Sequence, residues 1–227
     1  MTAVLAKGNP RDSGYARNAN DWYVEPAEAV HALLDVETFQ GETLDPACGG
    51  GNIVRVFRSR GLNAWGSDLV MRYDQMETDA MPRPMFGCTG DFTRPVPDEC
   101  CGNVDNIVSN PPFKIAEKFI VNGLKRARHK VALLQRLAFL EGQQRAALFT
   151  STPLARVHVF AYRISMPPGG TEIEAKGGSV AFAWFVWEHG YRGAPTINWL
   201  TRPERGLGAE KAQLMTLPTV SAEDVKQ

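Results

Sequence analysis

The chain has 227 residues, of which 44% are hydrophobic and 22% charged, a composition typical of a globular protein with one substantial core. Basic and acidic residues number 25 each, so the net charge is zero and the whole molecule is not a polycation that binds nucleic acid by charge alone. No apolar run approaches the roughly 20 residues of a membrane span, and the N-terminus lacks the apolar core of a signal peptide, so we expect a cytoplasmic protein without a membrane partner.

A polar N-terminal stretch precedes the first expected helix. Residues 1–20 show no hydrophobic repeat, so we expect a flexible arm there and one folded domain over residues 21–201. Pro26 is tolerated in a first helical turn, and the apolar residues after it recur at helical spacing. The sequence therefore predicts a short amphipathic helix that begins near Pro26 and ends before Gly41.

Three strands are expected next, each followed by polar or glycine residues. The first covers 43–45, the second covers 63–67 and ends before Asp68, and the third is a short segment that ends before 90–92. Between the first two strands, a glycine-containing loop leads into a helix that stops near Gly61. Strand, loop and helix in this order form the repeating unit of an α/β protein.

The second half of the chain continues this alternation. Strands are expected over 104–109, 130–134, 156–164 and 180–187, and helices over 115–124 and 140–148. The last of these strands is apolar on both faces, as in a strand covered by helices on either side. We therefore predict an α/β fold with a doubly wound, mostly parallel sheet. A loop rich in Pro and Gly is expected over 165–179, and a weakly structured tail over 202–227.

The segment Asp45–Asn52 (DPACGGGN) is the first candidate for ligand binding. In an open parallel sheet, ligands bind at the carboxyl ends of the strands, where this segment falls. Its glycines permit a tight turn and a close approach of the backbone to a ligand. It lacks the Lys-Ser/Thr pair of a phosphate loop, and Val54 stands where a dinucleotide fingerprint has its third glycine. A zwitterionic ligand with an amino group therefore fits better than a triphosphate or a dinucleotide.

Two acids follow the next two strands. Asp68 lies about 20 residues beyond the glycine loop, where a carboxylate can accept hydrogen bonds from both hydroxyls of a ribose. Asp91 is placed to accept a hydrogen bond from an adenine amino group. Together these residues predict a nucleoside ligand without phosphates.

The cysteines do not indicate a cross-linked or metal-bound protein. Cys48, Cys88, Cys100 and Cys101 contain no CxxC pair. We therefore expect reduced thiols, with no disulfide framework and no metal site.

The segment Asn110–Phe113 (NPPF) directly follows an expected strand and carries the strongest functional signal. Two consecutive prolines fix the backbone and remove its donors. The Asn110 side-chain oxygen and the Pro111 carbonyl can then both accept from one amino group. An aromatic amine is a poor nucleophile until it becomes pyramidal, and holding its two hydrogens on acceptors favours that form. Phe113 offers a flat face on which a base can stack, worth about 1 to 3 kcal/mol.

In this order, Asp45–Gly51, Asp68, Asp91 and Ser109–Phe113 resemble the motifs of the Rossmann-like amino methyltransferases, especially the DNA N6-adenine enzymes. The resemblance covers about residues 21–200 and implies a seven-stranded sheet with the last strand antiparallel, and S-adenosyl-L-methionine as cofactor. It also implies DNA as the partner, with the target base extruded from the helix.

The resemblance assigns two sets of residues. The catalytic set, which would hold the target base, is Asn110, Pro111, Pro112 and Phe113. The set that would bind the cofactor is Tyr23, Val24, Pro26, Asp45, Pro46, Ala47, Cys48, Gly49, Gly51, Asn52, Asp68, Leu69, Asp91 and Phe92.

Two features depart from the family or extend the resemblance. The N-terminal segment Asp21–Pro26 (DWYVEP) has Glu25 where these enzymes commonly have Thr. Residues 181–187 and 196–200 are similar to small adenine methyltransferases of phages and prophages. No sequence-reading domain of normal length is visible, so specificity would come from 165–179, the loop after Phe113, or the basic stretch. The basic stretch comprises Lys114, Lys118, Lys125, Arg126, Arg128, Lys130, Arg136 and Arg145.

Alternative functions remain at this point. The NPP-aromatic motif also serves methyltransferases that act on RNA bases and on protein glutamine amides, and Phe in its fourth position is common among RNA enzymes. The Tyr-x-x-Pro segment and the Trp-rich strand favour DNA. A binding module that keeps the fold without catalysis is the other class, and consumption of the cofactor would distinguish it.

Overall fold

The computed structural model describes residues 22–72, 79, 81, 84–94, 102–171 and 178–202. The expected arm over 1–20, and all but the first residue of the expected tail over 202–227, lie outside the described residues. So do Cys100, Cys101 and part of the loop expected over 165–179.

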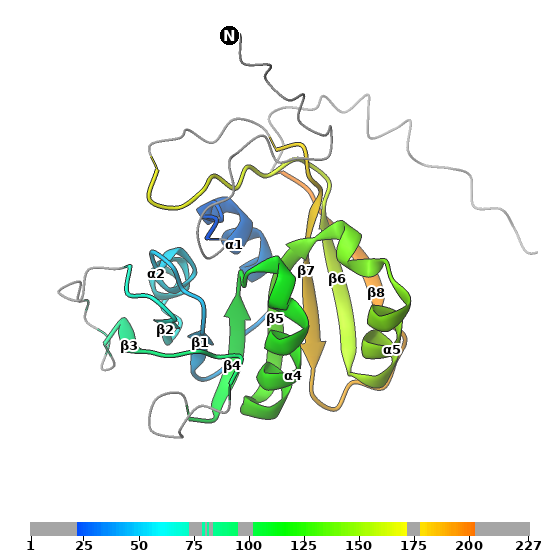
Figure 1. Ribbon diagram of the computed structural model, residues 1–227, viewed down its shortest axis with the longest axis horizontal. Helices are drawn as coiled ribbons and strands as arrows, with labels where there is room; N and C mark the ends of the chain where they lie inside the picture. Colours follow the sequence, from blue (N-terminus) through cyan, green and yellow to red (C-terminus); the bar gives the residue numbers. More distant parts are fainter. Residues whose placement is uncertain are drawn as a thin grey trace, which may run out of the picture.

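The described chain alternates helices and strands, as the sequence predicts (Figure 1). The strands are β1 (Thr43–Asp45), β2 (Ala64–Asp68), β3 (Phe86–Thr89), β4 (Val104–Ser109), β5 (Ala127–Arg136), β6 (Leu154–Phe160), β7 (Phe182–Glu188) and β8 (Thr196–Leu200). The α-helices are α1 (Ala27–Leu34), α2 (Asn52–Ser59), α4 (Ala116–Arg126) and α5 (Gln143–Ser151). Short 3-10 helices are η2 (Phe113–Ile115) and η3 (Leu137–Leu140).

One sheet contains all of these strands, in the order β3-β2-β1-β4-β5-β7-β6-β8. Strand β7 runs antiparallel to both of its neighbours, and the remaining neighbouring pairs are parallel. The strand order reverses between β1 and β4, so the carboxyl ends of these two strands define the switch point where α/β sheets bind their ligands.

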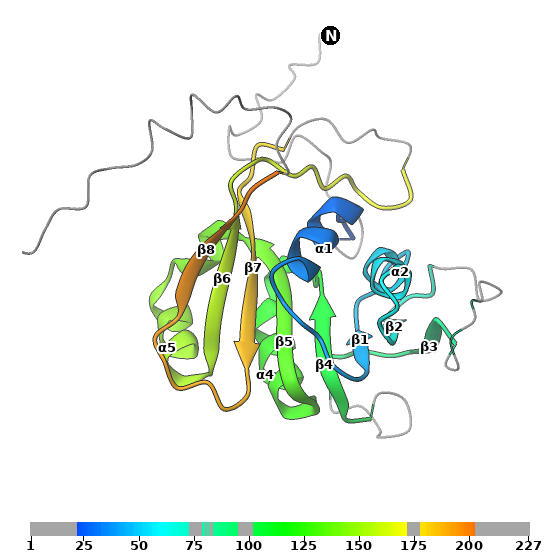
Figure 2. The same ribbon diagram turned by 180° about the vertical axis from the view of Figure 1, so that it is seen from behind.

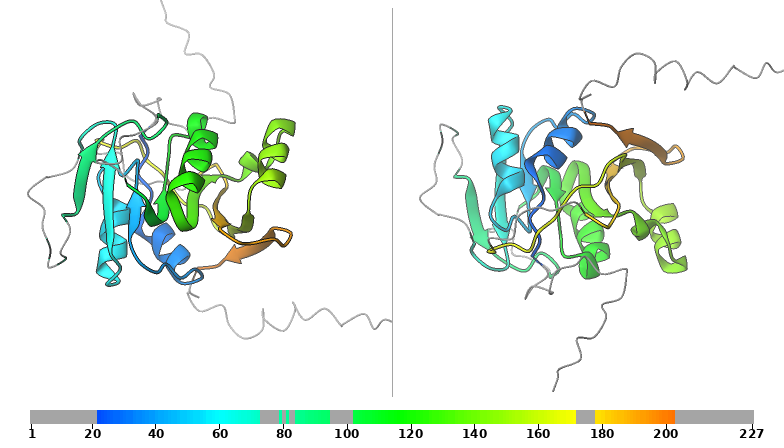
Figure 3. Two further views of the ribbon diagram at one scale, coloured as in Figure 1. Left: turned by 90° about the horizontal axis from the view of Figure 1, so that it is seen from below. Right: turned by 90° about the horizontal axis from the view of Figure 1, so that it is seen from above.

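Helices cover both faces of the sheet (Figures 2 and 3). Helices α1 and α2 pack on one face and α4 and α5 on the other, so two apolar clusters form with the sheet between them. Alternate residues of β7 enter opposite clusters, which explains why its sequence is apolar at nearly every position. The Trp184 indole also donates to the carbonyl of Ala29, at 2.9 Å, and so fixes α1 to the sheet.

The predicted doubly wound α/β class is confirmed, and several strand bounds and the number of strands differ from the expectation. The sheet has an eighth strand, β8, beyond the seven expected, so the antiparallel strand is the seventh in the chain. Strand β6 ends at Phe160, whereas the sequence predicted a strand reaching residue 164. The apolar residues Ile164 and Met166 beyond it are buried in the core cluster beside α1 without belonging to a strand. Within the described residues, no helix is long and apolar enough to cross a membrane.

Candidate active site

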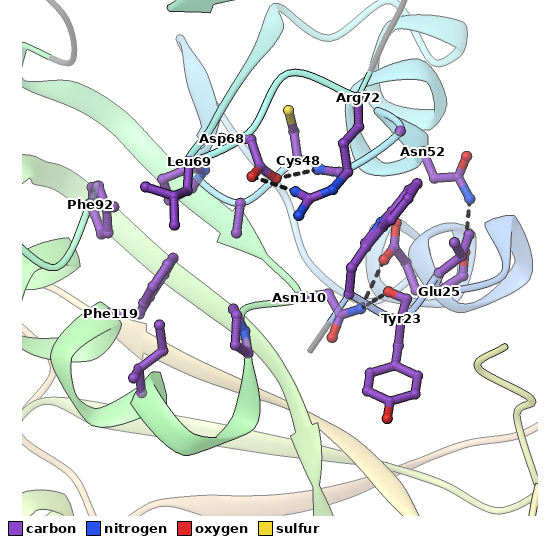
Figure 4. Close-up of a pocket in the computed structure, with 18 of the residues that line it drawn as sticks. Tyr23, Glu25, Cys48, Asn52, Asp68, Leu69, Arg72, Phe92, Asn110 and Phe119 are labelled. Carbon is purple, nitrogen blue, oxygen red and sulfur yellow. Dashed lines mark hydrogen bonds and ion pairs between the residues drawn. The ribbon is translucent and has the colours of Figure 1, made fainter. Parts of the chain in front are cut away.

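A cavity opens at the carboxyl ends of β1, β2 and β4, beside the switch point (Figure 4). It measures about 710 Å³ with its open mouth included. The residues that line it are Trp22, Tyr23, Val24, Glu25, Pro46, Ala47, Cys48, Gly49, Gly50, Asn52, Asp68, Leu69, Arg72, Gly90, Asp91, Phe92, Thr93, Asn110, Pro112, Ile115 and Phe119.

The loop after β1 requires glycine at position 49. Gly49 has a φ of 51°, in the left-handed region, and its N–H donates to Asp68 Oδ2 at 2.7 Å. A Cβ at this position would lie 2.4 Å from Nε1 of Trp22, whose indole packs directly on the loop. Glycine at position 49 therefore allows the loop to turn and allows the Trp22 side chain to pack against the loop backbone.

Asp68 lies at the carboxyl end of β2, as the sequence predicted, and is buried. Besides Gly49, it accepts hydrogen bonds at its Oδ1 from the N–H of Val70, at 3.0 Å, and from Arg72, at 2.7 Å. The Arg72 guanidinium also lies 4.9 Å from the ring of Trp22. A ligand that uses Asp68 would therefore share this carboxylate with Arg72 or displace it.

Another part of the cavity wall is formed by the aromatic rings of Phe92 and Phe119 and by the carboxylate of Asp91. The rings of Phe92 and Phe119 lie 5.1 Å apart, and both side chains are buried. The Asp91 carboxylate accepts from the Oγ1 and N–H of Thr93, and these bonds, outweighing desolvation, lower its pKa. A flat apolar group with a polar edge fits between such walls.

The side-chain amide of Asn110 is held in one orientation. Its Nδ2 donates to the carbonyl of Tyr23, at 3.0 Å, and to Oε2 of Glu25, at 2.9 Å. Both amide hydrogens are then engaged, and the side-chain oxygen is left as an acceptor at the cavity wall. The Glu25 side chain therefore helps to set which atom Asn110 presents.

Two buried carboxyl groups stand behind this amide. Burial raises the pKa of Glu25 to about 7, although the hydrogen bond from Asn110 opposes the shift. Burial and the nearby Glu25 charge raise the pKa of Asp45, although Ser109 Oγ donates to it at 2.7 Å. Arg72 is the one basic residue among those lining the cavity, against the acids Glu25, Asp68 and Asp91. The cavity therefore favours a ligand that carries positive charge.

Cys48 is a neutral thiol at the cavity wall. Its burial, with the charges of Asp45 and Asp68, raises its pKa well above the ordinary value. A thiol that remains protonated at neutral pH is a poor nucleophile. Cys48 therefore contributes packing volume and not covalent chemistry.

The N-terminal segment 22–25 connects the cavity to the loop after β6. The N–H of Val24 donates to the carbonyl of Pro167, at 2.9 Å, and the N–H of Gly169 donates to the carbonyl of Trp22, at 3.0 Å. The indole of Trp22 lies against Gly169 as closely as against Gly49. This segment therefore touches the glycine loop, the Asn110 amide and the 167–169 loop at once.

Phe113 lies outside the cavity, behind Asn110. Its ring is half-buried, with the Tyr23 ring 6.3 Å away and nearly parallel and the Phe182 ring at 5.9 Å. In Figure 4 the Tyr23 ring points away from Asp68 and Phe92. Asn110 and Pro112 of the NPPF motif thus line the cavity, whereas Phe113 belongs to the aromatic cluster outside it.

Most of the residues expected at the site line the cavity, and five of them do not. Of the two expected sets, the residues that do not line the cavity are Pro26, Asp45, Gly51, Pro111 and Phe113. Pro26 precedes α1 and Gly51 precedes α2, so both shape the backbone beside the cavity.

Sequence reasoning did not assign several residues that line the cavity: Trp22, Glu25, Gly50, Arg72, Gly90, Thr93, Ile115 and Phe119. Arg72 carried no signal, since residues 69–72 are not helical and a spacing of four predicts pairing of opposite charges only in a helix. Phe119 carried none, because its helical spacing is that of an ordinary core residue.

The basic stretch does not form one surface at this site. Arg128 pairs with Asp105, and Lys130 pairs with Glu37, at the amino end of β5 and so away from the cavity. Arg145 donates to the carbonyl of Glu141 in the preceding turn. Arg136, at the carboxyl end of β5, lies on the same sheet edge as Asn110, and Lys114 follows the motif in η2.

Comparison with solved structures identifies the class of fold. A protein predicted to be an O-methyltransferase from Agrobacterium tumefaciens superposes with a TM-score of 0.54 at 11% identity, over 84% of this chain and 95% of that one. A protein assigned as the modification subunit of a type I restriction enzyme from Vibrio vulnificus gives 0.52 at 15% identity, over 81% of this chain. A protein assigned as an RNA methyltransferase from Pyrococcus horikoshii gives 0.50 at 12% identity, over 74% of this chain and 87% of that one.

The chain has the Rossmann-like methyltransferase fold. It spans about half of the Vibrio vulnificus subunit, 48% of that chain. The sequence itself matches no protein-family model and no curated protein. At these identities the likeness shows the fold, and the reaction has to be argued from the site.

Proposed function

We propose that this protein is a methyltransferase that uses S-adenosyl-L-methionine to methylate the N6 amino group of adenine in DNA. The observation that carries the proposal is the Asn110 amide, whose nitrogen is bound by Tyr23 and Glu25 so that its oxygen is presented as an acceptor at the cavity. A neutral amide cannot act as a general base at pH 7, so this oxygen serves to align an amine.

The cavity residues fit S-adenosyl-L-methionine. The buried Asp68 carboxylate suits the ribose hydroxyls, and the space beside Phe92 and Asp91 suits an adenine ring with its amino group. The excess of acidic groups suits the ammonium and the sulfonium. When bound, the cofactor supplies an electrophilic methyl group on sulfur.

The chain's own residues would hold the second substrate. Asn110 Oδ1 and the Pro111 carbonyl would accept the two hydrogens of the target amine, which leaves its lone pair facing the cofactor cavity. Phe113 would contact the ring of an extruded base along the part of its surface that Tyr23 and Arg136 do not cover. The neutral Cys48 fits direct transfer without a covalent enzyme intermediate.

Adenine in DNA is chosen over the alternatives on the resemblance of the Tyr23–Pro26 segment and of the Trp-rich strand β7 to DNA enzymes. The same alignment would also serve an amino group on an RNA base or a glutamine amide, because all three present two hydrogens on a planar nitrogen. The DNA assignment therefore needs a direct test.

Methyl transfer to three substrates in parallel tests the proposal. Purified protein is incubated with methyl-labelled S-adenosyl-L-methionine and unmethylated DNA, RNA or a protein extract, and each product is digested to nucleosides or amino acids. We expect label in N6-methyl-2′-deoxyadenosine. Label in a methylated ribonucleoside or in methylglutamine would replace the DNA assignment, and no label in any arm would refute the methyltransferase proposal for these substrate classes.

A further inference from the structure

Arg136 occupies the sheet edge that carries the proposed catalytic motif. It is the last residue of β5, and β5 pairs in parallel with β4 so that Leu133 is opposite Ser109. Arg136 therefore lies three residues beyond the partner of Ser109, on the same edge as Asn110. Of the other residues in the expected basic stretch, Arg128 and Lys130 lie at the opposite end of β5, whereas Lys114 directly follows the motif in η2.

The Arg136 guanidinium has a ring contact but no counter-ion. Its Cζ lies 4.8 Å from the centre of the Phe113 ring. Its Nε is buried and has no hydrogen-bond partner, and no carboxylate among the described residues forms an ion pair with it. By contrast, two other arginines with little exposed side chain, Arg58 and Arg156, each pair with a carboxylate, from Asp79 and Glu37 respectively.

A half-buried guanidinium without a counter-ion is a costly feature, and an anion bound at its Nη atoms would supply the missing charge. Arginine presents a planar fork of donors that matches the oxygens of a phosphate or a carboxylate. The Arg136 Cζ lies over the Phe113 ring, and this contact restrains the guanidinium beside the motif. The structure thus places a hydrogen-bond donor for one anion, the Arg136 guanidinium, beside Phe113 of the motif.

The substrate classes differ in whether they bring such an anion. Every nucleotide carries a phosphodiester on the sugar that bears its base, so an extruded base at Phe113 necessarily brings a phosphate near it. A glutamine side chain brings no obligatory anion near its amide. We propose that Arg136 binds a phosphodiester that flanks the target nucleotide. This inference rests on the proposed function and narrows its substrate to nucleic acid.

The test compares Arg136→Gln and Arg136→Lys with the wild type. The ligand is a short DNA duplex that carries one candidate adenine, and its affinity is measured by fluorescence anisotropy at several salt concentrations. We expect Arg136→Gln to weaken binding roughly tenfold and to lower the salt slope by about one, as for the loss of one phosphate contact. Arg136→Lys keeps the positive charge and loses the planar set of guanidinium donors. Its DNA affinity should therefore lie between those of the wild type and Arg136→Gln.

Arg128→Gln is the matched control. It removes the same charge from the same strand, but at the amino end of β5, where Arg128 is exposed and pairs with Asp105. Its DNA affinity should stay near that of the wild type. Cofactor affinity, measured by calorimetry, should be unchanged in every variant, and this shows that each one is folded.

Neutral phosphates identify the contact itself. Duplexes with a methylphosphonate at each phosphate flanking the target should bind the wild type about as weakly as an unmodified duplex binds Arg136→Gln. The same modification should not lower the affinity of Arg136→Gln for the duplex any further. An equal loss in the wild type and in Arg136→Gln, or unchanged affinity of Arg136→Gln for the unmodified duplex, would overturn the inference.

Failure of the proposed function can be distinguished from failure of this inference, because the proposed function is tested by methyl transfer with the wild type alone. If the wild type methylates RNA and not DNA, the same methylphosphonate comparison on RNA applies, and Arg136→Gln should again be insensitive. If the wild type methylates a glutamine peptide and neither nucleic acid, both the inference and the DNA assignment are wrong.

Discussion

The Asn110 amide is the residue on which the proposed chemistry depends. Asn110→Ala should lower the methylation rate by roughly two to three orders of magnitude, the usual scale for the loss of one aligned polar group. Cofactor affinity should change little, because the role of Asn110 is to align the target amine. Single-turnover rates and calorimetry on the same preparations would measure the two effects.

Cys48→Ala is the control for that variant. It changes another residue that lines the cavity, but one whose thiol is neutral, so most activity should remain. A folded Cys48→Ala protein that binds cofactor and is inactive, or a fully active Asn110→Ala protein, would contradict the mechanism.

Glu25 gives the site a dependence on pH. Burial raises its pKa to about 7, so the carboxyl group becomes ionised as the pH rises through 7. A carboxylate accepts the Asn110 Nδ2–H more strongly than a carboxylic acid does, and this polarises the amide toward its oxygen. We therefore expect the single-turnover rate at saturating cofactor to rise between about pH 6 and pH 8, centred on the shifted pKa.

Glu25→Gln separates the charge from the geometry. Glutamine keeps an acceptor oxygen for Asn110 but does not titrate, so the rise near pH 7 should disappear while a basal rate remains. Glu28→Gln, which removes an exposed carboxylate one helical turn away, should keep the wild-type profile. A Glu25→Gln profile that still rises near pH 7 would assign the titration to another group.

At the scale of elements, an ionic network joins the segment after α1 to β5, β6 and β7. The buried Glu37 carboxylate pairs with Lys130 and Arg156 and is hydrogen-bonded to His158, and Arg156 also pairs with Glu188. Burial alone would raise the pKa of Glu37, but the hydrogen bonds from His158, Arg156 and Lys130 lower it to about 2. The folded state therefore binds this proton less tightly than the unfolded chain does.

This network predicts how stability depends on acid. Because the pKa of Glu37 is lowered, its contribution is fully present above about pH 4.5 and is lost as the pH falls through 2. The shift corresponds to about 3 kcal/mol in the free energy of unfolding. Glu37→Gln should destabilise the fold by roughly 3 to 5 kcal/mol at pH 7 and flatten the pH dependence below 4.5.

Denaturant unfolding at pH 3, 5 and 7 measures this effect. Asp35→Asn is the control. Asp35 lies two residues before Glu37 in the chain, and its ion pair with Arg60 is exposed. Its free energy of unfolding should change by less than about 1 kcal/mol. Equal effects of the two substitutions would mean that burial of the Glu37 network adds nothing.

The elements also show what the sequence could predict. Strands β1 and β4 match their expected bounds, because each leads directly into a motif of glycine, proline or polar residues that marks its end. Strand β8 was not expected, because four of its five side chains are exposed and it therefore lacks the apolar alternation of a half-buried strand. Its place is fixed by main-chain pairing with β6, which no local pattern encodes.

The same distinction applies to the site. Asp68 and Asn110 were predictable, since each follows a buried strand that delivers it to the carboxyl edge. Trp22 and Glu25 reach the cavity through contacts with residues distant in sequence, Gly169 and Asn110. Such contacts depend on tertiary packing, and composition and spacing do not reveal them.

At the scale of the whole molecule, the position of Asn110 restricts how DNA can be used. Asn110 lies at a cavity wall, so an amino group inside a stacked helix cannot reach it and the base must be extruded at a cost of a few kcal/mol. A duplex with a mismatched or unpaired target adenine should therefore bind more tightly than the matched duplex. Competition binding with the two duplexes measures the difference, and equal affinities would argue against extrusion.

The segment 22–25 has a thermodynamic consequence. It contacts the glycine loop through Trp22, the Asn110 amide through Glu25, and the 167–169 loop through main-chain hydrogen bonds. A ligand in the cofactor cavity and a ligand held by the 167–169 loop therefore act on the same four residues. By linkage, whatever factor the cofactor imposes on DNA affinity, DNA must impose on cofactor affinity, with the same sign and size.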